Sequence, residues 1–478
     1  MLFNSISFAI FLPIIFLLYW FVSKGKPKFQ NIILLVASYF FYASWDYRFL
    51  FLLLFSTGLD FYTGIKIDTA QLKKHKKVWL LLSICINLGF LGLFKYYNFF
   101  AESFADALHL LGFKVSDFTL KLILPVGISF YTFHGLSYII DIYNGKIKAE
   151  RNAIDYAVFV SFFPLLVAGP IERATQLLPQ LKVRRSFDVA KAINGLQQML
   201  WGFFKKIVIA DNCATYVNQI FANSESYDGS TLVIGAVFFA FQVYGDFSGY
   251  SDIAIGTARL FGIDLMKNFA YPFFSRNMAE FWRRWHISLS TWFRDYIYFP
   301  LGGNRGSTFL QIRNVLIIFL LSGLWHGAAW TYILWGFLHA LYVMPTVIFK
   351  VKNRYEDTVA HGRMLPSIKE LFQMLGTFGL FVFALTIFRS SDLSQAYQYL
   401  GEIFSKSLFT YPQVLPSQLL LTILVFMVVE WIGREHNFAI ETFYLNWPKP
   451  IRWAFYYCIV ISILYFHGSD QQFIYFQF

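Results

Sequence analysis

Charged side chains are scarce in this sequence, and their scarcity decides the class of protein. Only 14% of the 478 residues are Asp, Glu, Lys or Arg, whereas soluble domains carry about 25% charged residues. Hydrophobic residues reach 57%, and the mean hydropathy is +0.51. This composition argues against a water-soluble fold and predicts an integral membrane protein.

Cysteine is also rare, and several catalytic motifs are missing. Cys85, Cys213 and Cys458 are widely spaced, which indicates neither a disulfide framework nor a metal cluster. The sequence has no GxSxG nucleophile elbow, no HExxH zinc helix and no CxxC pair. These absences argue against a hydrolase and against a zinc enzyme, and we expect no bound cofactor or metal.

Acidic residues are outnumbered, since 28 Asp and Glu stand against 40 Lys and Arg and leave a net charge of +12. In a membrane protein, such an excess indicates cytoplasmic loops and anionic lipid headgroups rather than nucleic acid. The basic clusters are Lys24, Lys26 and Lys28, then Lys73, Lys74, Lys76 and Lys77, then Lys182, Arg184, Arg185 and Lys191. The first two clusters fit an N-terminus outside the cytoplasm.

Apolar segments recur along the whole chain, and no long hydrophilic block separates them. A spanning helix needs about 20 mostly apolar residues. The best candidates are 6–22, 78–97, 122–142, 231–244, 315–335 and 419–431. Shorter or interrupted segments are 31–42, 49–62, 154–167, 193–210, 371–388 and 451–466. We therefore predict an all-α polytopic membrane protein with about ten to twelve spans, and no internal repeat supports a transporter built from inverted halves.

Proline and glycine interrupt the middle of the chain more than its ends. Non-helical backbone at membrane depth persists only where protein buries it or where it lines a watery cavity, so we expect a cavity there. Residues 244–255, YGDFSGYSDIAI, resemble a broken helix. Asp246 or Asp252 would orient a histidine or pair with an arginine, since a buried carboxylate needs a partner. The alternative is a turn at the lipid interface.

Residues 280–298, EFWRRWHISLSTWFRDYIY, predict one amphipathic helix. Arg283, His286, Ser290 and Arg294 would fall within roughly an 80° arc of it, opposite an aromatic face. One interpretation is an interfacial helix whose arginines meet lipid headgroups. The other is a site, in which the arginines bind an anionic or carbonyl-rich ligand and favour a neutral, proton-accepting His286.

A second histidine ends a strongly apolar run, NVLIIFLLSGLWHGAA, at position 326. Ionisable groups in membrane segments are costly and mark sites by default, although a lone histidine can also be structural. His339, in LWGFLHALY, is interpreted as a structural histidine, and His134 ranks below His286 and His326 as a candidate for lining the cavity.

Several segments together resemble the membrane-bound O-acyltransferase family, within it the bacterial branch typified by the membrane subunit of alginate O-acetylation. They follow one another in order over nearly the whole chain: MLFNSISF, SYFFYASWD, PVGISFYTF, AGPIER, YGDFSGYSDIAIG, FWRRWHISLSTWFRDYIYFPLGGNRG and GLWHGAAWTYILWG. The resemblance implies a single transmembrane domain over residues 1–478, in which tilted and re-entrant helices form a ring around a central tunnel.

The resemblance also implies an activity and a site. The histidine of GLWHG, His326, would be catalytic, and His286 would line the tunnel beside it. We expect His326 to deprotonate the acceptor hydroxyl, or to carry a transient acyl group. We expect Arg283, Arg284 and Arg294 to contact the anionic part of the donor, with Ser290, Asp246 and Asp252 as further binding residues.

The expected reaction moves an acyl group, in particular acetyl, from a cytoplasmic thioester such as acetyl-CoA or an acylated carrier protein. The resemblance implies a bacterial inner membrane, an extracytoplasmic SGNH-type acetyltransferase as partner, and a polysaccharide such as alginate as acceptor. The alternatives are acetyl transfer to peptidoglycan or cellulose, D-alanyl transfer to teichoic acid, and a transporter that moves the donor without chemistry.

Overall fold

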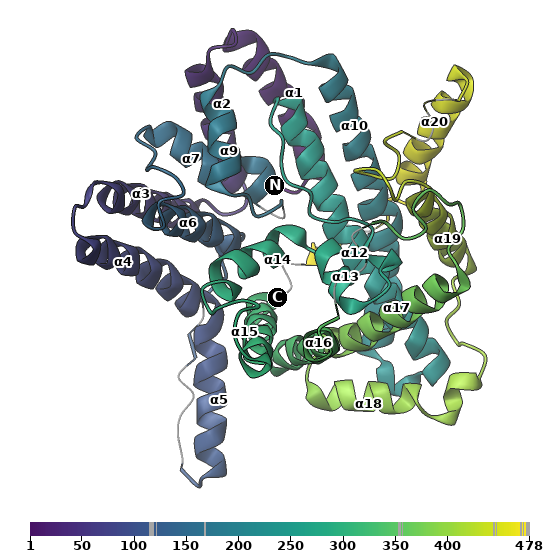
Figure 1. Cartoon of the computed structure of the whole chain (residues 1–478). Helices are drawn as coiled ribbons and strands as arrows, with labels where there is room; N and C mark the ends of the chain where they lie inside the picture. The colour runs from purple at the N-terminus through teal and green to yellow at the C-terminus, as the bar shows by residue number, and fades with distance from the viewer. Residues whose placement is uncertain are drawn as a thin grey trace. The chain divides into compact units, whose positions relative to one another are not determined.

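The computed structural model describes residues 1–113, 119–120, 122–166, 169–351, 355, 357–442, 445, 447–468, 471 and 473–474. Val167, at the end of the predicted segment 154–167, and Ala168 of the AGPIER motif lie outside the described residues. Every regular element in the described ranges is a helix (Figure 1). The predicted all-α fold is confirmed.

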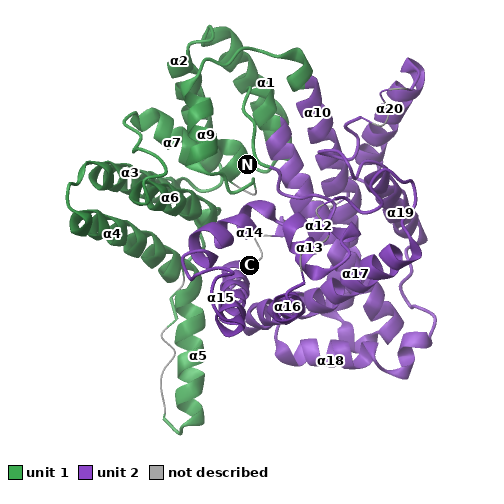
Figure 2. Ribbon diagram, in the orientation of Figure 1, with its two compact units in different colours: residues 1–192, 257–266 green, residues 193–256, 267–478 purple. Residues whose placement is uncertain are grey.

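The chain divides into two compact units (Figure 2). Unit 1 comprises residues 1–192 and 257–266, and unit 2 comprises residues 193–256 and 267–478. The prediction of one domain over the whole chain stays a prediction.

Unit 1 holds the first nine α-helices and the start of a tenth. They are α1 (Ile6–Leu17), continued by a π-helical turn (Leu18–Val22), α2 (Pro27–Ala43), α3 (Tyr47–Thr69), α4 (Lys73–Leu91), a π-helical turn (Gly92–Tyr96), α5 (Tyr97–Leu110), α6 (Ile128–Tyr143), α7 (Ala153–Ser161), α8 (Phe163–Leu166), α9 (Ala174–Lys182) and α10 (Val189–Phe203), which ends in unit 2.

Helices α3, α4 and α6 pack side by side in unit 1 (Figure 1). The side chain of Asp46 accepts a hydrogen bond from the Arg48 amide at 2.9 Å and caps the start of α3. This helix runs past the predicted segment 49–62 and ends at Thr69, and polar residues on it are buried. Asp60 accepts hydrogen bonds from Ser83 at 2.5 Å and Asn87 at 2.8 Å, both on α4.

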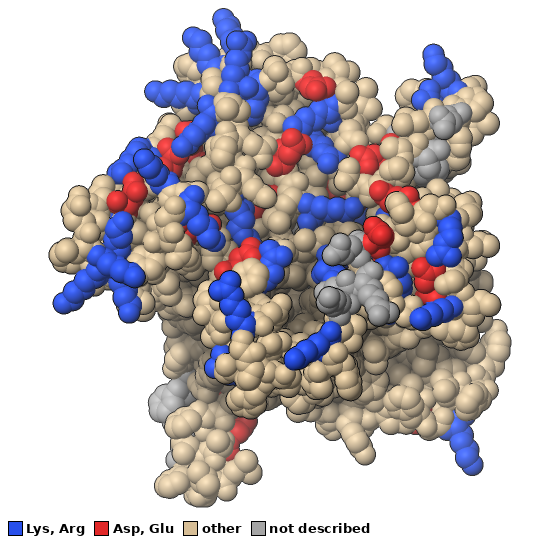
Figure 3. Space-filling view, viewed as in Figure 1, with Lys and Arg blue, Asp and Glu red and all other residues tan. Residues whose placement is uncertain are grey.

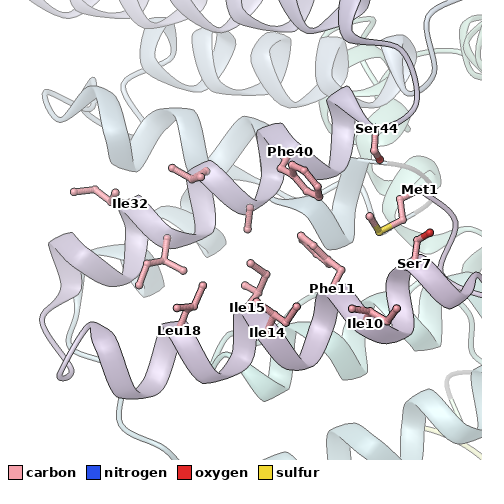
Figure 4. A pocket seen from close by; sticks show the side chains of 13 residues that line it. Met1, Ser7, Ile10, Phe11, Ile14, Ile15, Leu18, Ile32, Phe40 and Ser44 are labelled. Carbon is pink, nitrogen blue, oxygen red and sulfur yellow. The ribbon is translucent and has the colours of Figure 1, made fainter.

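An apolar groove of about 730 Å³ lies between α1 and α2 (Figure 4). Its walls include Ile14 and Leu18 from α1 and its π-helical turn, and Phe40 from α2. Exposed apolar surface of this extent is unfavourable in water but is expected on helices that face lipid.

Unit 2 carries the remaining helices. They are a π-helical segment (Phe204–Ala210), α11 (Asp211–Ala222), α12 (Gly229–Leu260, whose end belongs to unit 1), α13 (Met278–Arg284), α14 (Ile287–Phe293), a π-helical turn (Arg294–Tyr298), α15 (Thr308–His326), α16 (Trp330–Ile348), α17 (Ile368–Arg389), α18 (Leu393–Ile403), α19 (Ser417–Ile432) and α20 (Lys449–Tyr465). Short 3-10 turns lie at Ser224–Ser226, Pro272–Phe274 and Lys406–Phe409.

Six helical stretches in the described residues are long and apolar enough to cross a membrane: Tyr47–Thr69, Lys73–Leu110, Gly229–Leu260, Thr308–His326, Trp330–Ile348 and Ile368–Arg389. Two shorter apolar helices are Ile6–Val22 and Ser417–Ile432. This set confirms a multi-pass membrane protein but is smaller than the predicted ten to twelve spans. One reason is that segment 154–167 is cut at Phe162 into the short helices α7 and α8.

The predicted span 315–335 is wrong as a single helix, because the chain folds into the hairpin of α15 and α16. Glycines let the two backbones approach closely. A Cβ at Gly323 would lie 2.2 Å from the Tyr332 carbonyl oxygen, and one at Gly336 would lie 2.3 Å from that of Phe319. Small residues at a helix contact are the usual means of such packing in membranes.

Gly323→Ala is therefore expected to force the hairpin apart. We expect a loss of stability of about 1–3 kcal/mol, the usual cost of overpacking. Gly376→Ala on α17 is the matched control, since no atom lies within 4 Å of its added Cβ, and it should be neutral or stabilising. Thermal unfolding of the purified proteins checks this, and equal melting temperatures for the two variants would contradict it.

Candidate active site

His326 is the last residue of α15, at the turn of the α15–α16 hairpin. Gly327 then takes an extended conformation and ends the helix. The His326 side chain is only 6% exposed. Its ring lies 5.0 Å from that of Trp325, 5.0 Å from that of Trp335 on α16 and 5.4 Å from that of Phe388 on α17, measured between centroids. The imidazole is therefore enclosed by aromatic rings of its own unit and does not face lipid.

His286 lies at a break between two short helices. Helix α13 ends at Arg284, His286 has a left-handed backbone (φ 43°, ψ 53°), and α14 begins at Ile287. The prediction of one continuous helix over 280–298 is wrong. A left-handed backbone is strained for a residue other than glycine, so the surrounding structure must hold it in place.

Asn268 holds this break. Its backbone carbonyl accepts a hydrogen bond from the Ile287 amide at 2.8 Å. Its side-chain oxygen accepts from the Ser288 amide at 3.3 Å and from the Ser288 hydroxyl at 2.9 Å, and it lies 3.2 Å from Nδ1 of His286. Its side-chain nitrogen donates to Ser251 on α12 at 3.0 Å.

These contacts assign the tautomer of His286. The backbone amide of Ser288 can only donate, so the Asn268 atom that it meets must be the oxygen. Nδ1 of His286 faces the same oxygen and therefore carries the proton. Nε2 is then the nitrogen that can accept a proton from a reacting group.

The two histidines are near neighbours. The ring of His286 lies 5.6 Å from that of Trp325, and the ring of Trp325 lies 5.0 Å from that of His326. Burial lowers the pKa of His286 well below its ordinary value, and a positive charge on His326 lowers it further. His286 is consequently neutral near pH 7, and protonation of one imidazole opposes protonation of the other.

The predicted cationic face does not form, because the break at His286 separates its members. Arg284 pairs with Glu280 at 2.9 Å one helical turn away. Arg283 donates to the backbone carbonyl of Tyr355 at 3.0 Å.

The other two members of the predicted face also have local partners. Arg294 lies in the π-helical turn after α14, where it is exposed and pairs with Asp295 at 2.9 Å. The Ser290 hydroxyl donates to the backbone carbonyl of Trp285 at 3.3 Å. Arg283 and Arg284 lie before the break, and Ser290 and Arg294 lie after it, so the four do not line one continuous helix. Their predicted role in binding the donor stays a prediction.

Asp246 and Asp252 lie on one continuous helix, α12, so the prediction of a broken helix over 244–255 is wrong. Neither carboxylate pairs with the predicted arginines. Asp246 pairs with Lys206 at 2.8 Å, and Asp252 pairs with Lys205 at 2.6 Å. A lysine of the π-helical segment packed against α12 thus neutralises each carboxylate, of which Asp246 is buried.

The remaining buried histidines have local partners. Nδ1 of His339 accepts a hydrogen bond from Trp282 at 3.3 Å, and its ring packs on Trp335 at 4.6 Å between centroids. His134 lies in unit 1, where its Nε2 accepts from the Glu172 backbone amide at 3.1 Å. Among the described residues, no group of three or more His, Cys, Asp or Glu side chains is placed to hold a metal ion.

Sequence reasoning missed three residues that shape this unit. Lys205 and Lys206 interrupt the apolar segment 193–210, and ionisable residues inside such a run were a usable signal. Asn268 carries no such signal, because its importance depends on contacts with residues about twenty positions away in the chain.

A model of the membrane-bound O-acyltransferase family matches residues 147–386. The chain is 40% identical over 407 residues to the probable alginate O-acetylase AlgI of Pseudomonas aeruginosa, covering 85% of this chain and 75% of that protein. It is 35% identical to the peptidoglycan O-acetyltransferase of Helicobacter pylori, covering 83% of this chain and 78% of that protein.

A more distant relative is the teichoic acid D-alanyltransferase of Bacillus subtilis, which is 30% identical over 52% of this chain and 63% of its own length. The family match runs from before α7 into α17 and therefore includes both His286 and His326. This chain belongs to the membrane-bound O-acyltransferase family and is a multi-pass membrane O-acyltransferase.

Proposed function

We propose that this O-acyltransferase transfers an acetyl group from a cytoplasmic thioester for the O-acetylation of an extracytoplasmic polysaccharide, with alginate as the leading acceptor. The relatives of highest identity named above act in alginate and peptidoglycan O-acetylation. D-alanyl transfer to teichoic acid has less support, because the corresponding relative matches only about half of the chain.

The observation that carries this proposal is that His286 and His326 are both buried and that their rings both lie next to the Trp325 ring. An acyl transfer to a hydroxyl needs a base for the hydroxyl proton and a site that keeps water from the thioester. Neutral imidazole is the side chain best suited to accept a proton near pH 7. Aromatic walls exclude water without adding a carboxylate that would hold a proton on either ring.

In the proposed reaction, His326 takes the proton of the acceptor hydroxyl as that oxygen attacks the thioester carbonyl. The carbon–sulfur bond then breaks, and the proton passes from His326 to the departing thiolate. The products are an ester and a free thiol. His286, fixed by Asn268 with Nε2 able to accept a proton, positions the reacting groups and stabilises charge beside His326.

The donor is proposed to be acetyl-CoA or an acetylated carrier protein, and no cofactor is required. Arg283 and Arg294 are exposed guanidinium groups in the same unit and would contact the anionic part of the donor. Arg284 would contribute less, since it is largely buried in its pair with Glu280, whereas the pair of Arg294 with Asp295 is exposed. The proposed location is the bacterial inner membrane, with an extracytoplasmic SGNH-type acetyltransferase as the partner that completes transfer to the polymer.

His326→Gln is expected to lower acyl transfer by at least about 100-fold, since general acid–base catalysis contributes about 10²–10⁴-fold. Release of free thiol from acetyl-CoA by the purified protein, in the presence of its extracytoplasmic partner and the acceptor polysaccharide, measures the effect. His75→Gln, at an exposed position in unit 1, is the matched control and should keep full activity. A His326→Gln protein with normal membrane abundance and normal thiol release would remove His326 from the mechanism.

Asn268→Asp is expected to shift the acid limb of the kcat/KM profile to higher pH. The new carboxylate would lie beside Nδ1 of His286 and favour the imidazolium, which raises the pKa of His286. As pH falls, the neutral form would then be lost earlier. The substitution also removes the side-chain nitrogen that donates to Ser251, so Ser251→Ala is the control and should leave the acid limb in place. An unchanged limb in Asn268→Asp would contradict the proposed role of His286.

Proteoliposomes with labelled acetyl-CoA, an acetylated carrier and D-alanyl carrier as alternative donors test the reaction class. We expect free thiol to appear in step with label on the polysaccharide when the extracytoplasmic partner is present. Transfer only from D-alanyl carrier would favour teichoic acid, and label on peptidoglycan alone would favour that acceptor. Labelled donor that crosses the proteoliposome membrane intact, without release of thiol, would refute the proposed chemistry.

A further inference from the structure

Two basic clusters that lie about 160 residues apart in the sequence meet at one groove in unit 1. The groove has a volume of about 370 Å³ and is lined by Phe16, Trp20, Phe21, Lys24, Gly25, Arg184, Arg185, Ser186 and Phe187. Basic side chains gather on the face shown in Figure 3, including the edge where α1 and α2 meet. The groove is distinct from the residues of the proposed acyl transfer, all of which belong to unit 2.

The loop between α9 and α10 is held in place by a buried arginine. Arg185 donates to the Asn31 side chain at 2.5 Å and to that of Gln30 at 3.3 Å, both on α2. Its guanidinium group is therefore bound by side chains inside unit 1. The neighbouring residue, Arg184, extends toward the α1–α2 turn, where its Nε lies 3.2 Å from the position of a Cβ on Gly25.

The turn itself has an uncommon backbone. Lys24 and Gly25 both have left-handed conformations, with φ of 49° and 68°. Such a conformation is costly for lysine and persists at sites where the structure requires it. Here it directs the chain so that Lys24 and Arg184 border the same groove.

These two cations have no ion-pair partner among the residues that the structure describes. Within the part of the chain that the structure describes, neither Lys24 nor Arg184 forms a hydrogen bond or an ion pair, and both are exposed. An arginine fork and a lysine ammonium over one cavity are suited to a phosphate group.

The walls of the groove indicate where that phosphate comes from. Phe16, Trp20 and Phe21 belong to the apolar helical stretch Ile6–Val22, and Phe21 is 72% exposed. The Trp20 ring packs against Phe187 at 5.4 Å between centroids, and its Nε1 donates to the Leu260 carbonyl at 3.0 Å. Aromatic residues at the end of an apolar helix mark the headgroup level of a membrane.

We propose that this groove binds the phosphate headgroup of an anionic phospholipid. Lys24 and Arg184 contact the phosphate, and Trp20 and Phe187 pack against the glycerol region. The acyl chains then extend over the exposed apolar surface of α1. The site ties the α1–α2 turn and the α9–α10 loop to the leaflet that carries anionic lipid.

The test measures the binding of phosphatidylglycerol to the purified full chain by native mass spectrometry and by thermal shift, with phosphatidylcholine as the zwitterionic comparison. The variant is Lys24→Asn with Arg184→Gln, because asparagine tolerates the left-handed backbone better than most residues. We expect about 30-fold weaker binding of phosphatidylglycerol to the variant, from the loss of two basic contacts.

The matched control is Lys73→Gln with Lys74→Gln, which removes the same charge from another exposed basic cluster of unit 1 and should keep wild-type binding. Arg184→Gln alone repeats the measurement without a change in the turn. Equal binding of both lipids, or full binding by the groove variant, would overturn the proposal. Binding of free CoA that competes with the lipid and is lost in the same variant would also overturn it, because the groove would then serve a soluble phosphate.

Discussion

The amide and carbonyl of Asn268 replace the helical hydrogen bonds that the chain loses at His286. Breaking a helix inside an apolar protein leaves backbone amides that water cannot satisfy, and each costs free energy unless another group accepts from it. Asn268 accepts from the amides of Ile287 and Ser288 and so stabilises the left-handed backbone between α13 and α14. The side-chain oxygen that accepts from Ser288 also orients the His286 ring and fixes which of its nitrogens is protonated. The chemistry of the site therefore depends on this one residue.

Around these histidines, the unit separates aromatic side chains from charges. Trp325, Trp335 and Phe388 pack around His326, and none of them supplies a carboxylate. Asp246 and Asp252 are paired with lysines, so their negative charge does not stabilise an imidazolium. A neutral imidazole is the form that can act as a base, and this distribution of charge favours it.

Unit 1 also has a polar interior, but its groups serve structure and membrane contact. Asp60 joins α3 to α4 through hydrogen bonds with Ser83 and Asn87. Arg185 joins the α9–α10 loop to α2. Arg185 is buried by these hydrogen bonds, whereas the neighbouring Arg184 is exposed at the surface. A single basic cluster in the sequence therefore contains both a structural cation and one that can bind an anion.

Composition and apolar segments determined the membrane class, the all-helical fold and the approximate position of most helices, because hydrophobic burial in lipid depends on length and composition alone. His286 and His326 stood out in the sequence because they are ionisable residues in apolar surroundings, and such residues are costly and usually mark a functional site. Helical periodicity failed over 280–298, where a side chain distant in sequence holds a left-handed residue. It failed again at 315–335, where glycines permit a tight hairpin. The partners of Asp246, Asp252 and Arg283 were likewise decided only by tertiary structure, because a charge pairs with whatever group the fold brings near it. Arg284 and Arg294 instead pair with near neighbours in the sequence.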